Sequence, residues 1–162
     1  MEATMKCWTR AFAIDDLPVG QAKLFRDADH QVAVFRPGRD ELHAVDNLCP
    51  HEGYPLVQGD LRGSVLTCCW HNYKFDVRDG ACIKGEEAVR TYGVREREGT
   101  IELDLTPPDT TAQIPAYWQS LEEGMTERRI GQATRQAARL LIAGVAPEQL
   151  AAFAAGFDGA RA

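Results

Sequence analysis

Short apolar stretches separated by turn-forming residues fill the first two-thirds of the chain. Residues 32–35 form an uninterrupted apolar run, and residues 42–45 partly alternate between apolar and polar side chains. Both patterns are typical of strands that bury at least one face. Turn-forming clusters at residues 37–40 and 78–80 interrupt the apolar stretches. The pattern predicts strands over residues 6–12, 21–26, 31–36, 42–47, 64–67, 74–76, 90–97 and 100–105.

The spacing of these strands indicates the fold class and the domain organisation. Closely spaced strands with such turns predict a mainly β fold, either an antiparallel sandwich or a barrel. The character of the chain changes at residues 106–114, a stretch rich in Pro and Thr whose composition marks it as a linker. We therefore expect a β-domain over residues 1–105, a linker over 106–114 and a short helical extension over 115–162.

Helical periodicity dominates the region after the linker. Pro115 predicts the start of a first helix, and Gly124 predicts its end. Thr126 would cap a second helix that ends at Gly144, and Pro147 would open a third. The apolar residues that recur at helical spacing are Ile130, Ala133, Ala137 and Leu141 in the second helix, and Leu150, Phe153 and Phe157 in the third.

The role of the helical extension stays open at this stage. Three short helices bury little apolar surface by themselves. The extension therefore packs on the β-domain, self-associates, contacts a partner, or begins a larger helical region. The face formed by Phe153 and Phe157 has no obvious partner in the sequence, which favours a larger helical region.

The composition is that of a globular protein, with 44% hydrophobic and 26% charged residues. No apolar run reaches the length of about 18 residues that a membrane helix needs. The first residues lack the apolar core of a signal peptide and a twin-arginine signal, so we expect a cytoplasmic protein without a membrane partner. A net charge of −6 disfavours nucleic acid as a partner, but it can steer the chain towards a basic patch on another protein.

Two short motifs carry the candidate chemistry. Cys49 and His51 form a C-x-H motif, and Cys68 and His71 form a C-x-x-H motif. Thiolates suit soft metals and iron–sulfur clusters, and imidazole suits iron as well as zinc. Two Cys and two His also make a structural zinc site, but zinc motifs usually pair Cys with Cys and His with His. A [2Fe–2S] cluster in which two His replace two Cys is the other possibility.

The residues around these ligands resemble the Rieske family, in its soluble ferredoxin-type branch. The two segments that carry the resemblance are residues 49–53, CPHEG, and residues 68–76, CCWHNYKFD. The resemblance implies an antiparallel β fold with an inserted cluster-binding subdomain. It also implies one [2Fe–2S] cluster, with Cys49 and Cys68 on one iron and His51 and His71 on the other. The expected function is one-electron transfer between a reductase and a terminal oxidoreductase or oxygenase, without a substrate site of its own.

The resemblance also indicates a low reduction potential. High-potential members of the family carry a disulfide at the positions of Tyr54 and Trp70, and hydroxyl donors at the positions of Tyr73 and Phe75. Hydrogen bonds to the cluster sulfurs raise the potential, and Phe75 has no hydroxyl to donate. Residues 80–89, which match a proline-containing loop over the cluster in many members, contain no proline.

The chain has three further cysteines and two further histidines outside the two motifs. Cys7, Cys69 and Cys82 are expected to be free thiols in a reducing compartment. His30 and His43 are the remaining histidines and do not supply the two-His, one-carboxylate iron site of an oxygenase.

The alternatives to an electron carrier are a redox-sensing or interaction module and the N-terminal redox domain of a larger oxidoreductase. A nitrite reductase small subunit fits poorly, because those domains commonly lack the ligands that this chain has.

Overall fold

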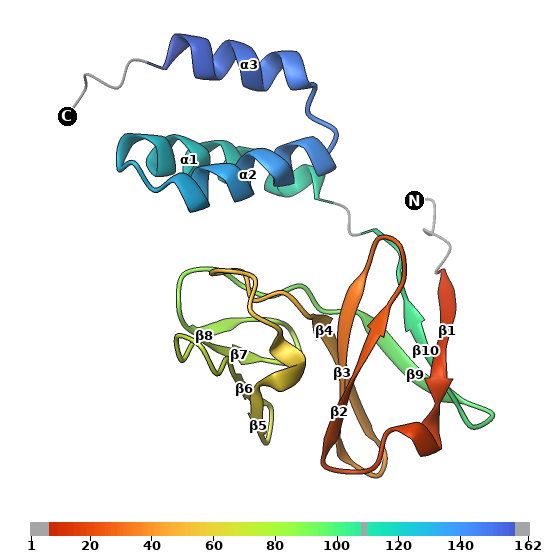
Figure 1. Cartoon of the computed structure of the whole chain (residues 1–162). Helices are drawn as coiled ribbons and strands as arrows, with labels where there is room; N and C mark the ends of the chain where they lie inside the picture. The colour runs from red at the N-terminus through yellow and green to blue at the C-terminus, as the bar shows by residue number, and fades with distance from the viewer. Residues whose placement is uncertain (1–6, 108–109, 158–162) are drawn as a thin grey trace. The chain divides into compact units, whose positions relative to one another are not determined.

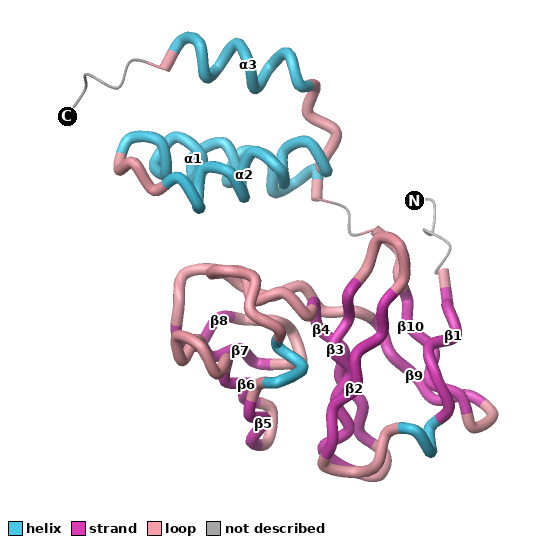
Figure 2. The backbone as a smooth tube through the Cα atoms, viewed as in Figure 1, coloured by secondary structure: helices cyan, strands magenta, loops and turns pink. Residues whose placement is uncertain are grey.

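The computed structural model describes residues 7–107 and 110–157, and the chain divides after Thr106 into two compact units (Figure 1). Figure 2 shows that all strands lie in the first unit and that the second unit is helical. Lys6, where the first strand was expected to begin, and the rest of the N-terminal segment lie outside the described residues. Within the described residues, none of the helices has the length and apolar character that crossing a membrane requires.

The first unit consists of three antiparallel sheets, which confirms the prediction of a mainly β fold. The sheets are open, and none closes into a barrel within the described residues. The first has the order β1 (Trp8–Ala13), β10 (Thr100–Asp104), β9 (Gly93–Arg97); the second has the order β2 (Gln21–Arg26), β3 (Gln31–Gly38), β4 (Glu41–Asp46). The third has the order β5 (Asp60–Arg62), β6 (Val65–Thr67), β7 (Lys74–Asp76), β8 (Cys82–Lys84). This third sheet is inserted in the chain between β4 and β9.

Strand β3 explains why its apolar run has no polar positions. Successive side chains of a strand point to opposite faces. Val32 and Val34 belong to one core, which also contains Ile101 from β10. Ala33 and Phe35 belong to a second core, which contains the buried residues of the third sheet. Because β3 is covered on both faces, it links the body of the β-domain to the inserted sheet.

The second unit contains α1 (Ile114–Thr126), α2 (Ile130–Ile142) and α3 (Pro147–Gly156). The prediction that Gly124 ends the first helix is wrong, since α1 continues through it. A Cβ atom at Gly124 would lie 2.9 Å from the backbone nitrogen of Ala133 in α2, so the glycine allows close helix contact instead. Thr126 does not cap the second helix, because it ends α1 and its hydroxyl donates to the carbonyl of Glu122 at 2.8 Å.

The apolar positions of α2 are only partly buried. The helix buries Gln136 and Leu140, whereas Ile130 is 79% exposed and Leu141 is 46% exposed. Gly144 follows the helix with a φ of 89°, as expected for its predicted end. In α3, the ring of Phe153 lies 5.1 Å from the ring of Trp118 in α1, so the aromatic face of α3 does have a partner within the helical unit.

Candidate metal centre

The two ligand-bearing loops have the same backbone plan. In the first loop, the amide of Cys49 donates to the carbonyl of Tyr54 at 2.9 Å, and the amide of Gly53 donates to the carbonyl of Cys49 at 2.7 Å. In the second loop, the amide of Cys68 donates to the carbonyl of Tyr73 at 2.8 Å, and the amide of Asn72 donates to the carbonyl of Cys68 at 3.2 Å. Each cysteine therefore stands at the start of a six-residue loop closed by two backbone hydrogen bonds.

The same position in both loops has a left-handed backbone conformation. The φ angle is 74° at Gly53 and 59° at Asn72. Glycine adopts this conformation at position 53 without steric cost. Asparagine is among the few other residues that adopt this conformation readily. The residue types at these two positions therefore follow from the turn that each loop must make.

The two thiols form a buried pair. Cys49 is 3% exposed and Cys68 is 2% exposed, and both belong to the core that contains Phe75. The two side chains lie close enough to influence one another electrostatically. Burial raises the pKa of the Cys49 thiol to about 11, and the Cys68 side chain adds to this effect. Because a metal binds the thiolate, metal binding at this pair would release protons.

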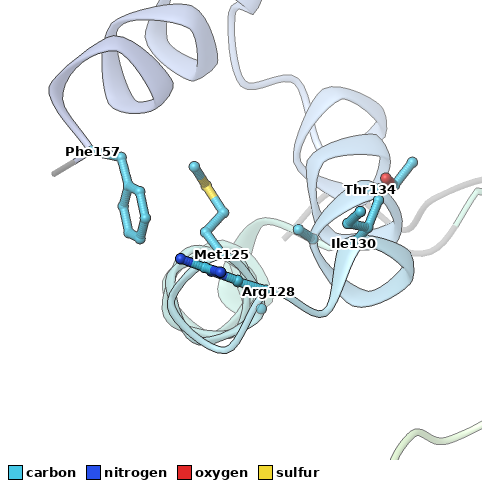
Figure 3. Close-up of a pocket in the computed structure, with 7 residues that line it drawn as sticks. Met125, Arg128, Ile130, Thr134 and Phe157 are labelled. Atoms are coloured by element: carbon cyan, nitrogen blue, oxygen red, sulfur yellow. The ribbon is translucent and has the colours of Figure 1, made fainter. Parts of the chain in front are cut away.

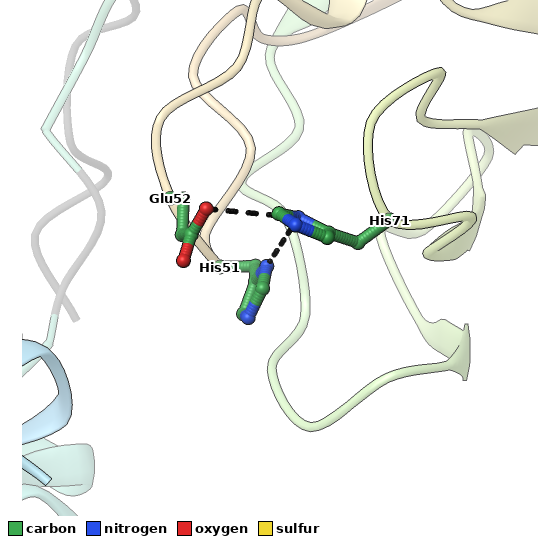
Figure 4. A group of neighbouring side chains, drawn as sticks. All are labelled: His51, Glu52 and His71. Atoms are coloured by element: carbon green, nitrogen blue, oxygen red, sulfur yellow. Dashed lines mark hydrogen bonds and ion pairs between the residues drawn. The ribbon is translucent and has the colours of Figure 1, made fainter.

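The two imidazoles form a second pair at the tips of the loops. Figure 4 shows the ring of His51 next to the ring of His71, with the carboxylate of Glu52 on the same side of His71 as His51. The Nδ1 atoms of the two histidines are 3.0 Å apart, and the rings are perpendicular. An oxygen of Glu52 lies 3.7 Å from Nδ1 of His71. Two nitrogens bound to one ion at about 2.1 Å lie about 3.0–3.4 Å apart, so the histidine pair fits a shared metal.

The arrangement of the four donors favours a cluster over a single zinc ion. The ligand atoms of a tetrahedral zinc site all lie within about 4 Å of one another, because each is about 2.0–2.3 Å from the metal. Among the described residues, the group whose donor atoms gather within 4.8 Å is His51, Glu52 and His71, and neither cysteine belongs to it. The donors thus form two separate pairs, which is the ligand set of a two-iron cluster with Cys on one iron and His on the other.

Aromatic side chains flank both histidines. The ring of Tyr73 stacks on His51, with centroids 4.6 Å apart and planes 15° apart. On the other side, Trp70 meets His71 edge-on at 5.7 Å and stacks on Tyr54 at 5.4 Å. Tyr54 and Trp70 are the positions where the high-potential relatives described above carry a disulfide. Here an aromatic stack joins the two loops at these positions.

Replacing Trp70 by alanine is expected to speed the loss of a bound cluster. Such a stack contributes about 0.5–1.5 kcal/mol, so the rate of cluster loss in moderate urea should rise roughly two- to tenfold. The decay of visible absorbance measures this rate. Trp70→Phe, which keeps a ring against Tyr54, and Trp118→Ala in the helical unit are the controls. A Trp70→Ala protein that loses its cluster at the wild-type rate would show that the stack does not hold the loops together.

The remaining cysteines and histidines lie apart from these two pairs. The thiol of Cys69 donates to the carbonyl of Gln58 at 2.8 Å. His30 contacts the carboxylate of Asp27, and His43 contacts that of Glu41. The cysteines that the structure describes are all free thiols.

Sequence reasoning missed one residue that positions the first loop. Asn47 is 2% exposed, and its side-chain oxygen accepts a hydrogen bond from the amide of Val57 at 3.0 Å. Its backbone carbonyl accepts a second one from Leu56 at 2.6 Å. Asn47 therefore ties the segment before the first loop to the segment after it. In the sequence, only its position just before Cys49 hinted at this role.

Comparison with known proteins agrees with this geometry. Residues 7–98 match the Rieske [2Fe-2S] domain. The chain is 36% identical over 114 residues to the 4beta-methylsterol monooxygenase of Methylococcus capsulatus, which covers 58% of this chain and 31% of that enzyme. It is 33% identical over 106 residues to the anthranilate 1,2-dioxygenase ferredoxin subunit of Burkholderia cepacia, which covers 64% of this chain and 97% of that subunit.

The solved structures include the ferredoxin of carbazole 1,9a-dioxygenase from Nocardioides aromaticivorans. It superposes with a TM-score of 0.55 at 30% identity, over 59% of this chain and 95% of the ferredoxin. The chain thus spans less than a third of the sterol monooxygenase but nearly the whole of the ferredoxins. The domain match extends over more than half of the 162 residues, and the chain belongs to the Rieske [2Fe-2S] domain family.

Proposed function

We propose that the chain is a cytoplasmic one-electron carrier that takes electrons from a reductase and delivers them to an oxygenase. Cys49 and Cys68 would hold one iron of a [2Fe–2S] cluster, and His51 and His71 would hold the other. The observation that carries this proposal is the separation of a buried thiol pair from a more exposed imidazole pair. The near-complete coverage of the anthranilate 1,2-dioxygenase ferredoxin subunit supports the assignment of partners.

In such a carrier, the thiol pair and the histidine pair would have different roles. When bound, the cluster supplies the one-electron redox step. The thiol pair is buried in the apolar core and so is shielded from water. The histidines lie nearer the surface, with Glu52 and Trp70 exposed beside them, so this end is the one a redox partner can approach. We also propose that the chain consists of a β-domain over residues 1–105, a linker over 106–114 and a helical extension over 115–162.

The potential of the cluster is expected near the lower end of the family range, about −150 mV. Phe75 is fully buried in the core with both cysteines and has no hydroxyl to donate to the cluster sulfurs. Loss of such hydrogen bonds disfavours the reduced cluster, which carries more negative charge. A redox titration followed by EPR measures the potential and identifies the cluster, because a Rieske centre has an average g below the free-electron value. A Rieske signal with a potential near +300 mV would contradict the low-potential assignment.

A second candidate is the redox domain of a larger oxidoreductase, which the match to the sterol monooxygenase favours. An oxygenase of this kind needs a further iron held by two His and a carboxylate. Among the described residues, the group of this composition is His51, Glu52 and His71, whose imidazoles are assigned to the cluster. The iron of such an enzyme would therefore have to be bound outside the described part of this chain.

A further inference from the structure

The helical unit contains an apolar groove that the proposed electron transfer does not use. It has a volume of about 460 Å³ and lies between the end of α1, the start of α2 and the residue that follows α3. Figure 3 shows Met125 and Phe157 on one side of the groove, and Ile130 and Thr134 on the other. The volume and the predominantly apolar lining are those of a site for a small molecule.

One cation lies at this groove. Arg128 is exposed and lines the groove next to Met125. Within the described part of the chain, no carboxylate lies within ion-pair distance of its guanidinium. The nearest acidic residue in sequence, Glu127, forms its ion pair with Arg129 instead. The charge of Arg128 is therefore available to a ligand in the groove.

The backbone of Arg128 adds a second observation. Its φ angle is 57°, one of three left-handed values among the described non-glycine residues. Glycine or asparagine would be the ordinary choice at this turn between two helices. Arginine at this position costs stability, and its conformation brings a long cationic side chain to the groove.

We propose that this groove binds an amphiphilic monocarboxylate, with its apolar body against Met125, Ile130 and Phe157 and its carboxylate on the guanidinium of Arg128. The apolar lining selects the body of the ligand, since burial of hydrocarbon is the main favourable term in such a groove. The guanidinium selects the head group, because its donors match the two oxygens of a carboxylate. The hydroxyl of Thr134 is a further polar group in the lining.

Titration of the full chain, with its cluster, tests this proposal directly. The probes are decanoate and decanol, which share a hydrocarbon chain and differ in the charge of the head group. The chain contains three methionines, and Met125 is the one in the groove, so the methyl NMR signal of Met125 reports where the probe binds. We expect decanoate to shift this signal and to bind about tenfold or more tightly than decanol.

Arg128→Gly is the informative variant, because glycine tolerates the left-handed backbone and removes the charge. It should weaken decanoate binding about tenfold, leave decanol binding unchanged and preserve or raise the melting temperature. Arg129→Gln, which removes a neighbouring cation outside the groove lining, should bind decanoate like the wild type. Equal binding of decanoate and decanol, or full decanoate binding by Arg128→Gly, would overturn the proposal. A Met125 signal that shifts with protein concentration and not with decanoate would also overturn it, since a second copy of the chain would then occupy the groove.

Discussion

Replacing Cys68 by serine is expected to abolish cluster binding, whereas replacing its neighbour Cys69 by serine leaves the cluster in place. Cys68 is buried in the same core as Cys49, so its loss removes one of the two thiolates that would hold one iron. Cys69 is exposed and its thiol donates to the carbonyl of Gln58, the last residue of a short 3-10 helix outside both ligand loops. The measurements are iron and sulfide content and the EPR signal of the reduced protein.

This pair of variants controls for the removal of a thiol as such. Both proteins lose one sulfur atom from adjacent positions, and serine has nearly the volume of cysteine. The expected results are no Rieske signal for Cys68→Ser and a wild-type signal for Cys69→Ser. A full complement of iron and sulfide in Cys68→Ser, or loss of the cluster in Cys69→Ser, would show that the ligand assignment is wrong.

The second large effect is expected from alanine at Gly80, which should destabilise the β-domain by about 2–5 kcal/mol. Gly80 is buried, has a φ of 79° and would place a Cβ atom 2.0 Å from the carbonyl oxygen of Val89. Backbone hydrogen bonds hold it on both sides, from its own amide to Asp76 and from the amide of Val89 to its carbonyl. The added methyl must therefore push apart two segments that the native fold ties together.

Gly63→Ala separates the effect of steric overlap on stability from the effect of the backbone conformation. Gly63 has a φ of 58°, but a Cβ atom there meets no other atom within 4 Å. Alanine at this position should cost only about 1 kcal/mol. Urea unfolding followed by circular dichroism gives both values. Equal losses of stability in the two variants would show that the close approach of Gly80 to Val89 is not present in solution.

The sequence predicted the long strands of the β-domain and the short strands β6 and β7, but it missed β5 and β8. The strand at β3 was identifiable because its apolar run reflects burial on both faces. Strands β5 and β8 were missed because neither buries a residue fully, whereas β6 and β7, which are equally short, each bury an apolar central residue. β5 pairs with β6, and β8 pairs with β7. This pairing determines where the two strands form, and it cannot be inferred from the residues of β5 or β8 alone.

The helical unit shows a different limit of sequence reasoning. A glycine near the end of an apolar periodic segment can stop a helix, or it can let a second helix approach. Gly124 does the latter, and only the position of Ala133 in α2 distinguishes the two roles. Similarly, Ile130 and Leu141 have helical spacing but stay exposed, because α2 turns Gln136 and Leu140 towards its neighbour.

At the candidate site, the sequence predicted the ligand types but not how the loops hold them. The spacing of Cys and His pointed to the two loops and to their metal chemistry. The stack of Tyr54 on Trp70 and the stack of Tyr73 on His51 depend on how two separate loops face one another. No pattern within either loop encodes such a contact, so these supports became visible only in three dimensions.

Because the two ligand-bearing loops have the same backbone hydrogen bonds, we expect electron exchange to be fast. A redox centre exchanges electrons fastest when its surroundings need not rearrange as charge arrives or leaves. Each loop is closed by two backbone hydrogen bonds that do not depend on the oxidation state of anything the loop binds. Both halves of the ligand set are therefore fixed in advance and in the same way. We expect a low reorganisation energy, so that the driving force supplied by the partner, and not movement of this chain, controls the rate.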